Sequence, residues 1–170
     1  TGDSARRLGE EYLFETLAKQ NIETMNKYKF NKVVASCPHC MHTILNEYPD
    51  FGGDYEVIHH TELIEELIAT GKIKPNINSD ETITFHDPCY LGRHNKIYNE
   101  PRNILENVAK TENIIEMKES KESSMCCGAG GGNMWHEIEG DRINVARFNQ
   151  AIDTGAKTVA TACSFCTIMM

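Results

Sequence analysis

Segments of helical and of strand-like hydrophobic spacing alternate along the chain. Between residues 5 and 27, apolar residues recur at helical spacing, which predicts one long helix. The buried face expected for that helix is made by Leu8, Tyr12, Leu13, Leu17 and Ile22. Short β-prone runs predict strands at 32–36, 55–58, 82–86, 113–117 and 158–161. Further helices are expected at 39–47, 61–69, 104–109 and 137–153.

This alternation predicts the fold class. Strands that are separated by helices usually pair in parallel, and the helices cover the sheet. We therefore expect an α/β protein with short, largely parallel sheets flanked by helices. In such folds, side chains that follow the carboxyl ends of strands face the crevice where sites are found.

The chain also contains an internal repeat. When Gly2 is aligned with Gly128, the Cys-x-x-Cys motif at 37–40 falls on the motif at 163–166 without a gap. In each copy a charged residue and a short β-prone run precede the motif. Self-similarity of this kind is typical of repeated structural units.

The repeat predicts two modules. Residues 1–75 would be the C-terminal part of the first module, and residues 76–170 a nearly complete second module. The stretch 70–80 contains Gly, Pro, Asn and Ser and is expected to link them. Because the chain begins at Thr1 and ends within a motif, we expect it to be a piece of a longer protein.

Composition narrows the range of partners. The 170 residues carry a formal net charge of −8 with a pI near 5.3, which disfavours nucleic acid or an anionic membrane surface as the partner. No apolar run approaches the length that spans a bilayer, and no signal peptide is present. The hydrophobic content of 40% is enough for a core.

The spacing of the cysteines indicates what chemistry the chain can perform. The chain has seven cysteines, and five of them form one pattern. The five are Cys89, the adjacent pair Cys126 and Cys127, and the pair Cys163 and Cys166. Adjacent cysteines are awkward as a disulfide, whereas a polynuclear metal centre needs several thiolates close together. We therefore expect these five to bind a metal centre.

The first Cys-x-x-Cys motif, Cys37 and Cys40, has three interpretations. It follows a strand and precedes a helix, where the helix N-terminus stabilises thiolates. It resembles a thioredoxin-like dithiol, but the second copy reads Cys-Ser-Phe-Cys, and long segments precede both. Zinc is an alternative, with a histidine as a third ligand, and so is an iron–sulfur cluster. The candidate histidines are His39, His59 and His60.

Several residues near the cysteines have a functional and an ordinary interpretation. Four glycines within 128–132 do not match a nucleotide-binding motif, and they allow the backbone to approach a cluster. His86, Asp87 and His94 flank Cys89 and are expected to be a strand-end cap and a surface histidine rather than groups around a metal. Similarly, Arg142 and Arg147 could offset thiolate charge, although solvated helix positions are the simpler expectation. Met134 and Trp135 are expected in the core.

Together these motifs resemble a known family, the CCG cysteine-rich domain. The matching pattern is Cys89, 36 residues, Cys126-Cys127-Gly128, 34 residues, and Cys163-x-x-Cys166. This domain occurs, usually twice per chain, in one of the subunits of heterodisulfide reductase. It also occurs in iron–sulfur subunits of anaerobic glycerol-3-phosphate dehydrogenase, glycolate oxidase and lactate-utilisation systems.

Three segments resemble one branch of that family, the large membrane-bound iron–sulfur oxidoreductases. The segments are Thr1–Phe14, Ser36–Cys40 and His86–His94. The resemblance implies upstream membrane and ferredoxin-like domains in the parent chain. It also implies electron flow between electron-transfer flavoprotein, or another dehydrogenase subunit, and menaquinone. This chain would then be a cytoplasmic portion held at the inner face of the membrane.

The resemblance also implies the cofactor. Cys89, Cys126, Cys127, Cys163 and Cys166 would hold a [4Fe–4S] cluster, which is noncubane in heterodisulfide reductase. Cys37 and Cys40 would belong to a second cluster or a zinc site with further ligands upstream of Thr1. This sequence departs from the family at Thr1, which stands where the second copy has Cys127. One thiolate fewer puts a noncubane cluster at the first site in question.

We thus expect an iron–sulfur oxidoreductase that relays electrons through the cluster. The alternative enzyme is a heterodisulfide or disulfide reductase, which requires a substrate pocket that opens onto the cluster. The alternative outside electron transfer is a structural module stabilised by zinc. Four-coordinate zinc leaves the fifth cysteine of the second module unexplained.

Overall fold

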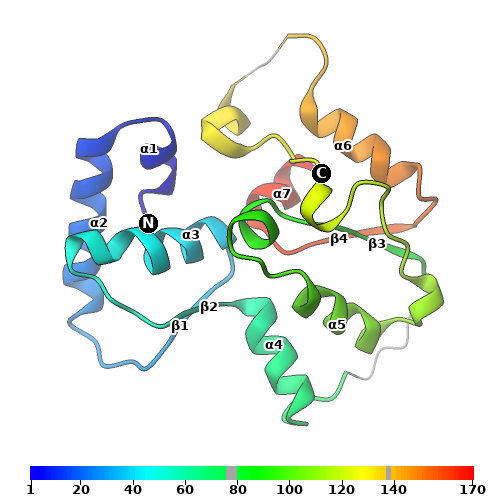
Figure 1. Cartoon of the computed structure of the whole chain (residues 1–170), viewed down its shortest axis with the longest axis horizontal. Helices are drawn as coiled ribbons and strands as arrows, with labels where there is room; N and C mark the ends of the chain where they lie inside the picture. Colours follow the sequence, from blue (N-terminus) through cyan, green and yellow to red (C-terminus); the bar gives the residue numbers. More distant parts are fainter. Residues whose placement is uncertain (76–79, 137–138) are drawn as a thin grey trace.

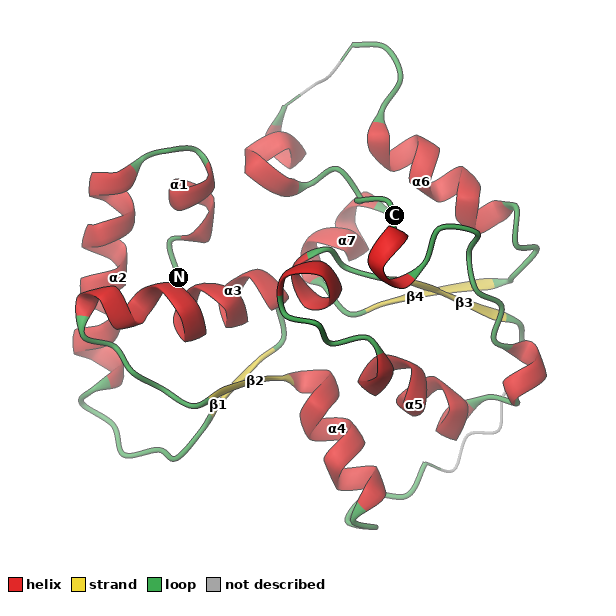
Figure 2. Ribbon diagram, viewed as in Figure 1, coloured by secondary structure: helices red, strands yellow, loops and turns green. Residues whose placement is uncertain are grey.

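The computed structural model describes residues 1–75, 80–136 and 139–170 and contains helices and two small parallel sheets (Figure 2). This confirms the predicted α/β class. The α-helices are α1 (Asp3–Arg7), α2 (Glu11–Met25), α3 (Pro38–His42), α4 (His60–Ala69), α5 (Asn99–Val108), α6 (Ile143–Ile152) and α7 (Ser164–Met169). The strands are β1 (Val33–Ala35), β2 (Val57–His59), β3 (Ile83–His86) and β4 (Thr158–Thr161).

Each sheet is one parallel pair. β1 pairs with β2, so that Ala35 lies opposite His59, and β3 pairs with β4, so that His86 lies opposite Thr161. In Figure 1 the β1–β2 pair belongs to the part of the chain that precedes α4, and the β3–β4 pair to the part that follows it. Because the strands are parallel, each pair directs two carboxyl ends toward the same edge.

The predicted strand at 113–117 is wrong. The structure has a short 3₁₀ turn, Thr111–Asn113, and a single bridge between Ile83 and Ile114 at this place. One backbone hydrogen bond, from Ile115 N–H to the Ile83 carbonyl, continues the contact. The segment therefore runs beside β3 without forming a strand.

The predicted helix at 5–27 is broken into α1 and α2. Gly9 has a φ of 81°, a left-handed conformation that glycine adopts readily, and the helix restarts at Glu11. The restart changes the buried face, which consists of Phe14, Ala18 and Ile22. Of the five residues expected on this face, only Ile22 is buried.

Other boundaries shift by several residues. The segment expected at 39–47 is α3 followed by a π-helical turn, Thr43–Glu47, and α5 begins at Asn99 rather than at 104. The helix expected at 137–153 is α6, which begins at Ile143. Residues 137–138 of that prediction, and 76–79 of the predicted linker, lie outside the described residues.

Two clusters of buried side chains hold the chain together. The larger is an ordinary hydrophobic core that includes Phe14, Met41, Tyr48, Leu91 and Ala162. The smaller consists of Ala129 and three cysteines, with other sulfur-containing or aromatic side chains beside them. The chain thus has a small buried cluster made mostly of sulfur, in addition to an ordinary hydrophobic core that takes residues from both halves.

His59 begins α4 as its N-cap. Its Nδ1 accepts a hydrogen bond from the Thr61 backbone N–H at 3.4 Å, and the Glu62 carboxylate accepts one from the His59 N–H at 2.8 Å. His59 is completely buried, and this burial, followed by the charge of His60, lowers its pKa to about 4. The helix start therefore requires a neutral imidazole.

We expect acid to destabilise the protein through His59. An unfolded histidine has a pKa near 6.5, so the unfolded state binds more protons than the folded state between pH 6.5 and about 4, and stability falls as pH falls through that window. For the shift at His59 the loss is on the order of 3 kcal/mol. His59→Asn retains a capping oxygen but cannot titrate.

Urea unfolding of the metal-free protein at pH 7, 6, 5 and 4 measures this contribution. The pH dependence of the free energy of unfolding should be smaller in His59→Asn than in the wild type. Equal pH dependence in the two proteins would show that His59 does not carry the effect.

Candidate metal centre

The two Cys-x-x-Cys motifs occupy the same structural position. β1 leads to Cys37, which is the N-cap of α3, and β4 leads to Cys163, which is the N-cap of α7. Cys37 and Cys163 both have extended backbone, with φ of −119° and −147°. The predicted strand–motif–helix arrangement is therefore present twice.

The five cysteines of the second half converge. The sulfurs of Cys127 and Cys166 lie 3.3 Å apart, and those of Cys89 and Cys126 lie 3.9 Å apart. β3 and β4 cause this, because Cys89 and Cys163 follow their parallel carboxyl ends. All seven cysteines are free thiols.

The pKa shifts of four of these cysteines show that their thiols do not all lose their protons when no cation lies among them. Hydrogen bonds from Cys127 and then Cys89 lower the pKa of Cys126 to about 2. Each donor in turn keeps its proton, so the pKa of Cys127 rises to about 11 and that of Cys89 rises further. Hydrogen bonds to Cys127 and Cys163, with burial, also raise the pKa of Cys166. Several thiolates at this place need cations among them, and a thiolate-ligated iron centre supplies those.

The glycine-rich turn follows the cysteine pair closely. Gly128 has a φ of 84°, and its N–H donates a hydrogen bond to the Cys126 sulfur at 3.3 Å. A β-carbon at Gly128 would lie 3.1 Å from the Ile143 side chain, so this position favours glycine for space and for backbone conformation. Hydrogen bonds from N–H groups to ligand sulfurs are one way in which proteins tune clusters.

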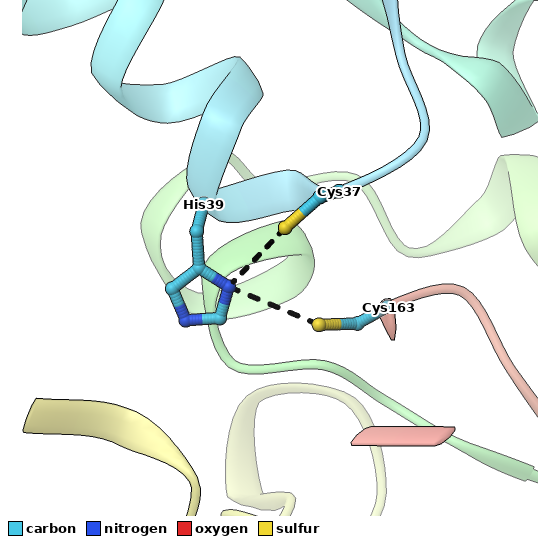
Figure 3. Close-up of side chains that lie close together, drawn as sticks. All are labelled: Cys37, His39 and Cys163. Atoms are coloured by element: carbon cyan, nitrogen blue, oxygen red, sulfur yellow. Dashed lines mark hydrogen bonds between the residues drawn. The ribbon is translucent and has the colours of Figure 1, made fainter. Parts of the chain in front are cut away.

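The first site lies directly beside the second, which the sequence analysis did not predict. His39 Nδ1 is 3.8 Å from the Cys37 sulfur and 3.8 Å from the Cys163 sulfur (Figure 3). These three buried groups, from both halves of the chain, are close enough to share one metal ion. His39 also stacks on Tyr90, with ring centroids 4.2 Å apart. Of the three histidines suggested as partners of Cys37, His39 therefore occupies that position, whereas His59 caps α4.

The charge state of His39 follows its neighbours. Burial lowers the pKa of His39, but hydrogen bonds to Cys163 and Cys37 outweigh it and raise the pKa to about 9. The pKa of Cys37 is correspondingly low, chiefly because Cys163 and Cys40 donate hydrogen bonds to it. In the metal-free protein, His39 is therefore a protonated imidazolium that lies between the sulfurs of Cys37 and Cys163.

The two copies of the sequence repeat make matching contacts in the structure. The Thr1 hydroxyl lies 3.4 Å from the Cys40 sulfur, which matches the 3.3 Å contact between Cys127 and Cys166 in the second half. Gly2 and Gly128, which follow Thr1 and Cys127, both have a φ of 84°. A hydroxyl therefore stands where the other site has a thiol.

A groove adjoins the first site. It has a volume of about 500 Å³ and reaches Cys37, His39 and Cys40. Apolar side chains from α2 and the turn before it line the groove, among them Leu8 and Leu13. Three of the five residues expected on the buried face of the first helix, Leu8, Leu13 and Leu17, thus line an opening instead.

Two further buried polar groups adjoin the second site. His86 and Arg147 are completely buried, and a ring nitrogen of His86 lies within 4.8 Å of the sulfurs of Cys127 and Cys166. The expectation that Arg147 lies on a solvated helix face is wrong, whereas it holds for Arg142, which is exposed. The exposed position of His94 agrees with the expected surface histidine.

Asp87 is buried as part of an ion-pair network. Arg102 donates to both its carboxylate oxygens, at 2.8 and 2.9 Å, and the Lys121 N–H donates at 2.8 Å. These hydrogen bonds fix the loop between β3 and Cys89 against α5 and against the segment that leads to Cys126. Asp87 therefore supports the site without facing the sulfurs.

Trp135 is not in the core. It is 74% exposed, and the turn before it contains Gly131 and Gly132 with φ of 64° and 78°. These left-handed residues interrupt the 3₁₀ segment Gly130–Trp135. Met134, by contrast, packs against the cysteine cluster as expected.

The fold and the converging cysteines agree with the comparison with known proteins. The CCG family, described as a cysteine-rich domain, matches residues 2–45 and 83–170. The chain belongs to this family. The matched ranges contain the cysteine pair, the glycine turn and both Cys-x-x-Cys motifs.

Curated relatives are iron–sulfur proteins or oxidoreductases by name. The chain is 48% identical over 171 residues to the probable iron-sulfur-binding oxidoreductase FadF of Bacillus subtilis, covering all of this chain and 24% of the relative. It is 45% identical over 177 residues to the EtfAB:quinone oxidoreductase of Syntrophomonas wolfei, covering 99% of this chain and 24% of the relative. It is 36% identical over 173 residues to a chain of the CoB–CoM heterodisulfide reductase of Methanosarcina acetivorans, covering 97% of this chain and 42% of the relative. The chain thus spans about a quarter of the first two relatives.

Within the described residues, none of the helices has the length and apolar character needed to cross a bilayer. This agrees with the sequence expectation for the segment.

Mild oxidation of the metal-free protein should report which sulfurs are neighbours. With diamide as the oxidant, we expect a disulfide between Cys127 and Cys166 first, because their sulfurs are 3.3 Å apart, and one between Cys89 and Cys126 next. Peptide mapping by mass spectrometry identifies the pairs. Cys166→Ser is the control and should abolish the first pair. Predominant pairing of Cys126 with the adjacent Cys127 would contradict this geometry.

Proposed function

We propose that this chain is the part of an iron–sulfur oxidoreductase that relays electrons through a [4Fe–4S] cluster. The proposed ligands are Cys89, Cys126, Cys127, Cys163 and Cys166. The single observation that supports it most is the convergence of these thiols in a buried cluster with few aliphatic side chains. Names of the relatives support the same class of chemistry.

When bound, the cluster supplies one-electron redox chemistry. The residues of this chain provide ligation, burial and hydrogen bonds. Cys127, Cys163 and Cys166 are buried, so water is kept from these sulfurs, while Cys89 and Cys126 are partly exposed. The exposed side is where an electron partner could approach.

Residues 1–75 and 76–170 are proposed as two modules of this kind. Cys37 and Cys40 would belong to a second centre, either another cluster or zinc, which takes further ligands from upstream of Thr1. The contact through His39 supports a second centre close to the first.

The proposed electron partners come from the relatives. The name of the Syntrophomonas wolfei relative joins electron-transfer flavoprotein and quinone. We propose that the parent of this chain likewise takes electrons from electron-transfer flavoprotein, or from another dehydrogenase, and passes them to menaquinone. Ferredoxin-like and membrane domains upstream would hold the chain at the cytoplasmic face of the membrane.

One observation favours a second function, reduction of a disulfide substrate. The groove of about 500 Å³ reaches Cys37 and Cys40, as a substrate pocket at a cluster would. A disulfide reductase would consume a heterodisulfide with electrons from a reduced donor, whereas an electron relay would leave it untouched. Incubation of the reduced protein with the heterodisulfide of coenzymes M and B distinguishes the two.

Anaerobic reconstitution with iron and sulfide tests the proposed centre. We expect about four irons bound at the second site and an EPR signal from the cluster in the reduced or oxidised protein. Cys126→Ser should lose most of this iron and the signal, because it removes the thiol on which Cys89 and Cys127 converge.

Ser123→Ala is the matched control. Its hydroxyl is exposed, lies three residues before Cys126 and, among the described residues, bonds only the Ser120 carbonyl, so iron content should stay at the wild-type value. A colourless, EPR-silent protein with one zinc ion bound at its second site would overturn the electron-relay function and support a zinc-stabilised module.

A further inference from the structure

α6 packs in an unusual way against the cysteine cluster. Its buried residues are Arg147 and Ala151, while Val145, Phe148 and Ile152 are 50%, 39% and 57% exposed. A helix normally buries its apolar residues and exposes its cations. α6 therefore brings a guanidinium, rather than an aliphatic side chain, into the interior beside the site.

Every hydrogen-bond acceptor of Arg147 is electrically neutral. Its Nε–H donates to His86 Nδ1 at 2.9 Å, and its Nη2 group donates to the Ser124 hydroxyl at 3.2 Å. Its Nη1 group donates to the Glu119 carbonyl at 2.8 Å and to the Gln150 amide oxygen at 2.6 Å. Among the residues that the structure describes, no carboxylate forms an ion pair with Arg147, although Arg102 has two.

A buried, unpaired guanidinium is unfavourable unless negative charge lies nearby. Arginine stays protonated in proteins, so the charge cannot be removed by titration. Burial lowers the pKa of Arg147, and the negative charges that oppose this are Asp87 first, then Glu119, and after them the sulfurs of Cys166 and Cys127 when these are ionised. The ligand sulfurs therefore add to the negative charge around the buried cation once they are thiolates, as they would be in a metal centre.

The hydrogen bond from Arg147 also determines the tautomer of His86. The guanidinium of Arg147 always keeps its proton, so His86 Nδ1 must accept this hydrogen bond with a lone pair. The proton of the neutral imidazole ring is therefore on Nε2. His86 Nε2 is buried and has no hydrogen-bond partner in the part of the chain that the structure describes. One ring nitrogen of His86 lies within 4.8 Å of the sulfurs of Cys127 and Cys166, and since Nδ1 is taken by Arg147, Nε2–H is the donor that the ring has left to offer them.

We propose that Arg147 and His86 form a positioning pair that offsets the negative charge of the metal centre. Arg147 contributes a buried positive charge and holds His86 as an Nε2–H donor toward the ligand sulfurs. The pair is outside the ligand set, because a protonated Nε2 has no lone pair for a metal. This inference rests on the proposed cluster only for its effect on the redox potential; the tautomer of His86 is a property of the protein alone.

The tautomer is measured without the cluster. In metal-free protein with ¹⁵N-labelled histidine, NMR should show His86 with a protonated Nε2 and an unprotonated Nδ1. Arg147→Met should remove the restriction and yield a mixture of tautomers. Protonated Nδ1 in the wild type, or an unchanged tautomer in Arg147→Met, overturns the proposal.

The redox potential is measured by EPR-monitored titration of the reconstituted protein. Hydrogen bonds and positive charge favour the reduced cluster, so Arg147→Met and His86→Leu should lower the potential. We expect the ratio of reduced to oxidised cluster at a fixed potential to fall about tenfold, equal to about 59 mV for one electron. His86→Gln retains an acceptor and a donor and should remain near the wild-type value.

Two controls separate this role from simple structural support. Arg142→Met removes the same charge from an exposed position next to α6 and should leave the potential unchanged, because solvent screens it. If Arg147→Met does not fold, the difference in redox potential between His86→Leu and His86→Gln still tests the proposal. An intact cluster with the same potential in all variants overturns the proposal, whereas absence of iron from the wild type overturns only the proposed function and leaves the NMR result decisive.

Discussion

Crowded sulfur is the constraint on which this structure depends. The chain carries seven free thiols, and four of them, Cys126, Cys127, Cys163 and Cys166, lie in or against a small buried cluster that is separate from the hydrophobic core. Sulfurs at such short separations do not all ionise, because Cys127 donates a hydrogen bond to Cys126, which lowers the pKa of Cys126 and raises that of Cys127. The surrounding fold is therefore organised to bring positive charge and N–H donors to one place.

The parallel strand pairs bring the groups around the sulfurs together. β3 and β4 end at the same edge, and the residues that follow them are Cys89 and Cys163. The loop that carries Cys126 is then held by Ser124, whose hydroxyl donates to the Asp87 carbonyl and accepts from Arg147. Short polar contacts thus join residues that are far apart in sequence, in addition to the hydrophobic core that both halves share.

Much of this could be predicted from the sequence, because the governing signals are local. The spacing of cysteines, the β-prone runs before Cys37 and Cys163, and the repeat between Gly2 and Gly128 depend only on neighbouring residues. The strand–motif–helix arrangement and the family follow from them. The break at Gly9 was missed because a helix tolerates glycine, and a single left-handed residue changed which face of α2 is buried.

The remaining features depend on tertiary contacts. His39 lies between Cys37 and Cys163, which are far apart in the sequence, and no spacing rule connects them. Arg147 was expected in solvent because α6 has more prominent apolar residues, such as Phe148, and charge normally faces water. The local rule fails here because the interior beside α6 contains ionisable sulfur.

The replacement of a thiol by the Thr1 hydroxyl has a consequence for direction. Two identical halves would offer an electron two equivalent positions, with no preference between them. The contact of Thr1 with Cys40 and that of Cys127 with Cys166 have nearly the same length but different chemistry, since a hydroxyl is far harder to deprotonate than a thiol. The duplicated fold is therefore chemically unequal at this position, and two redox centres bound in its halves would have different surroundings and different potentials, which is what would set a direction.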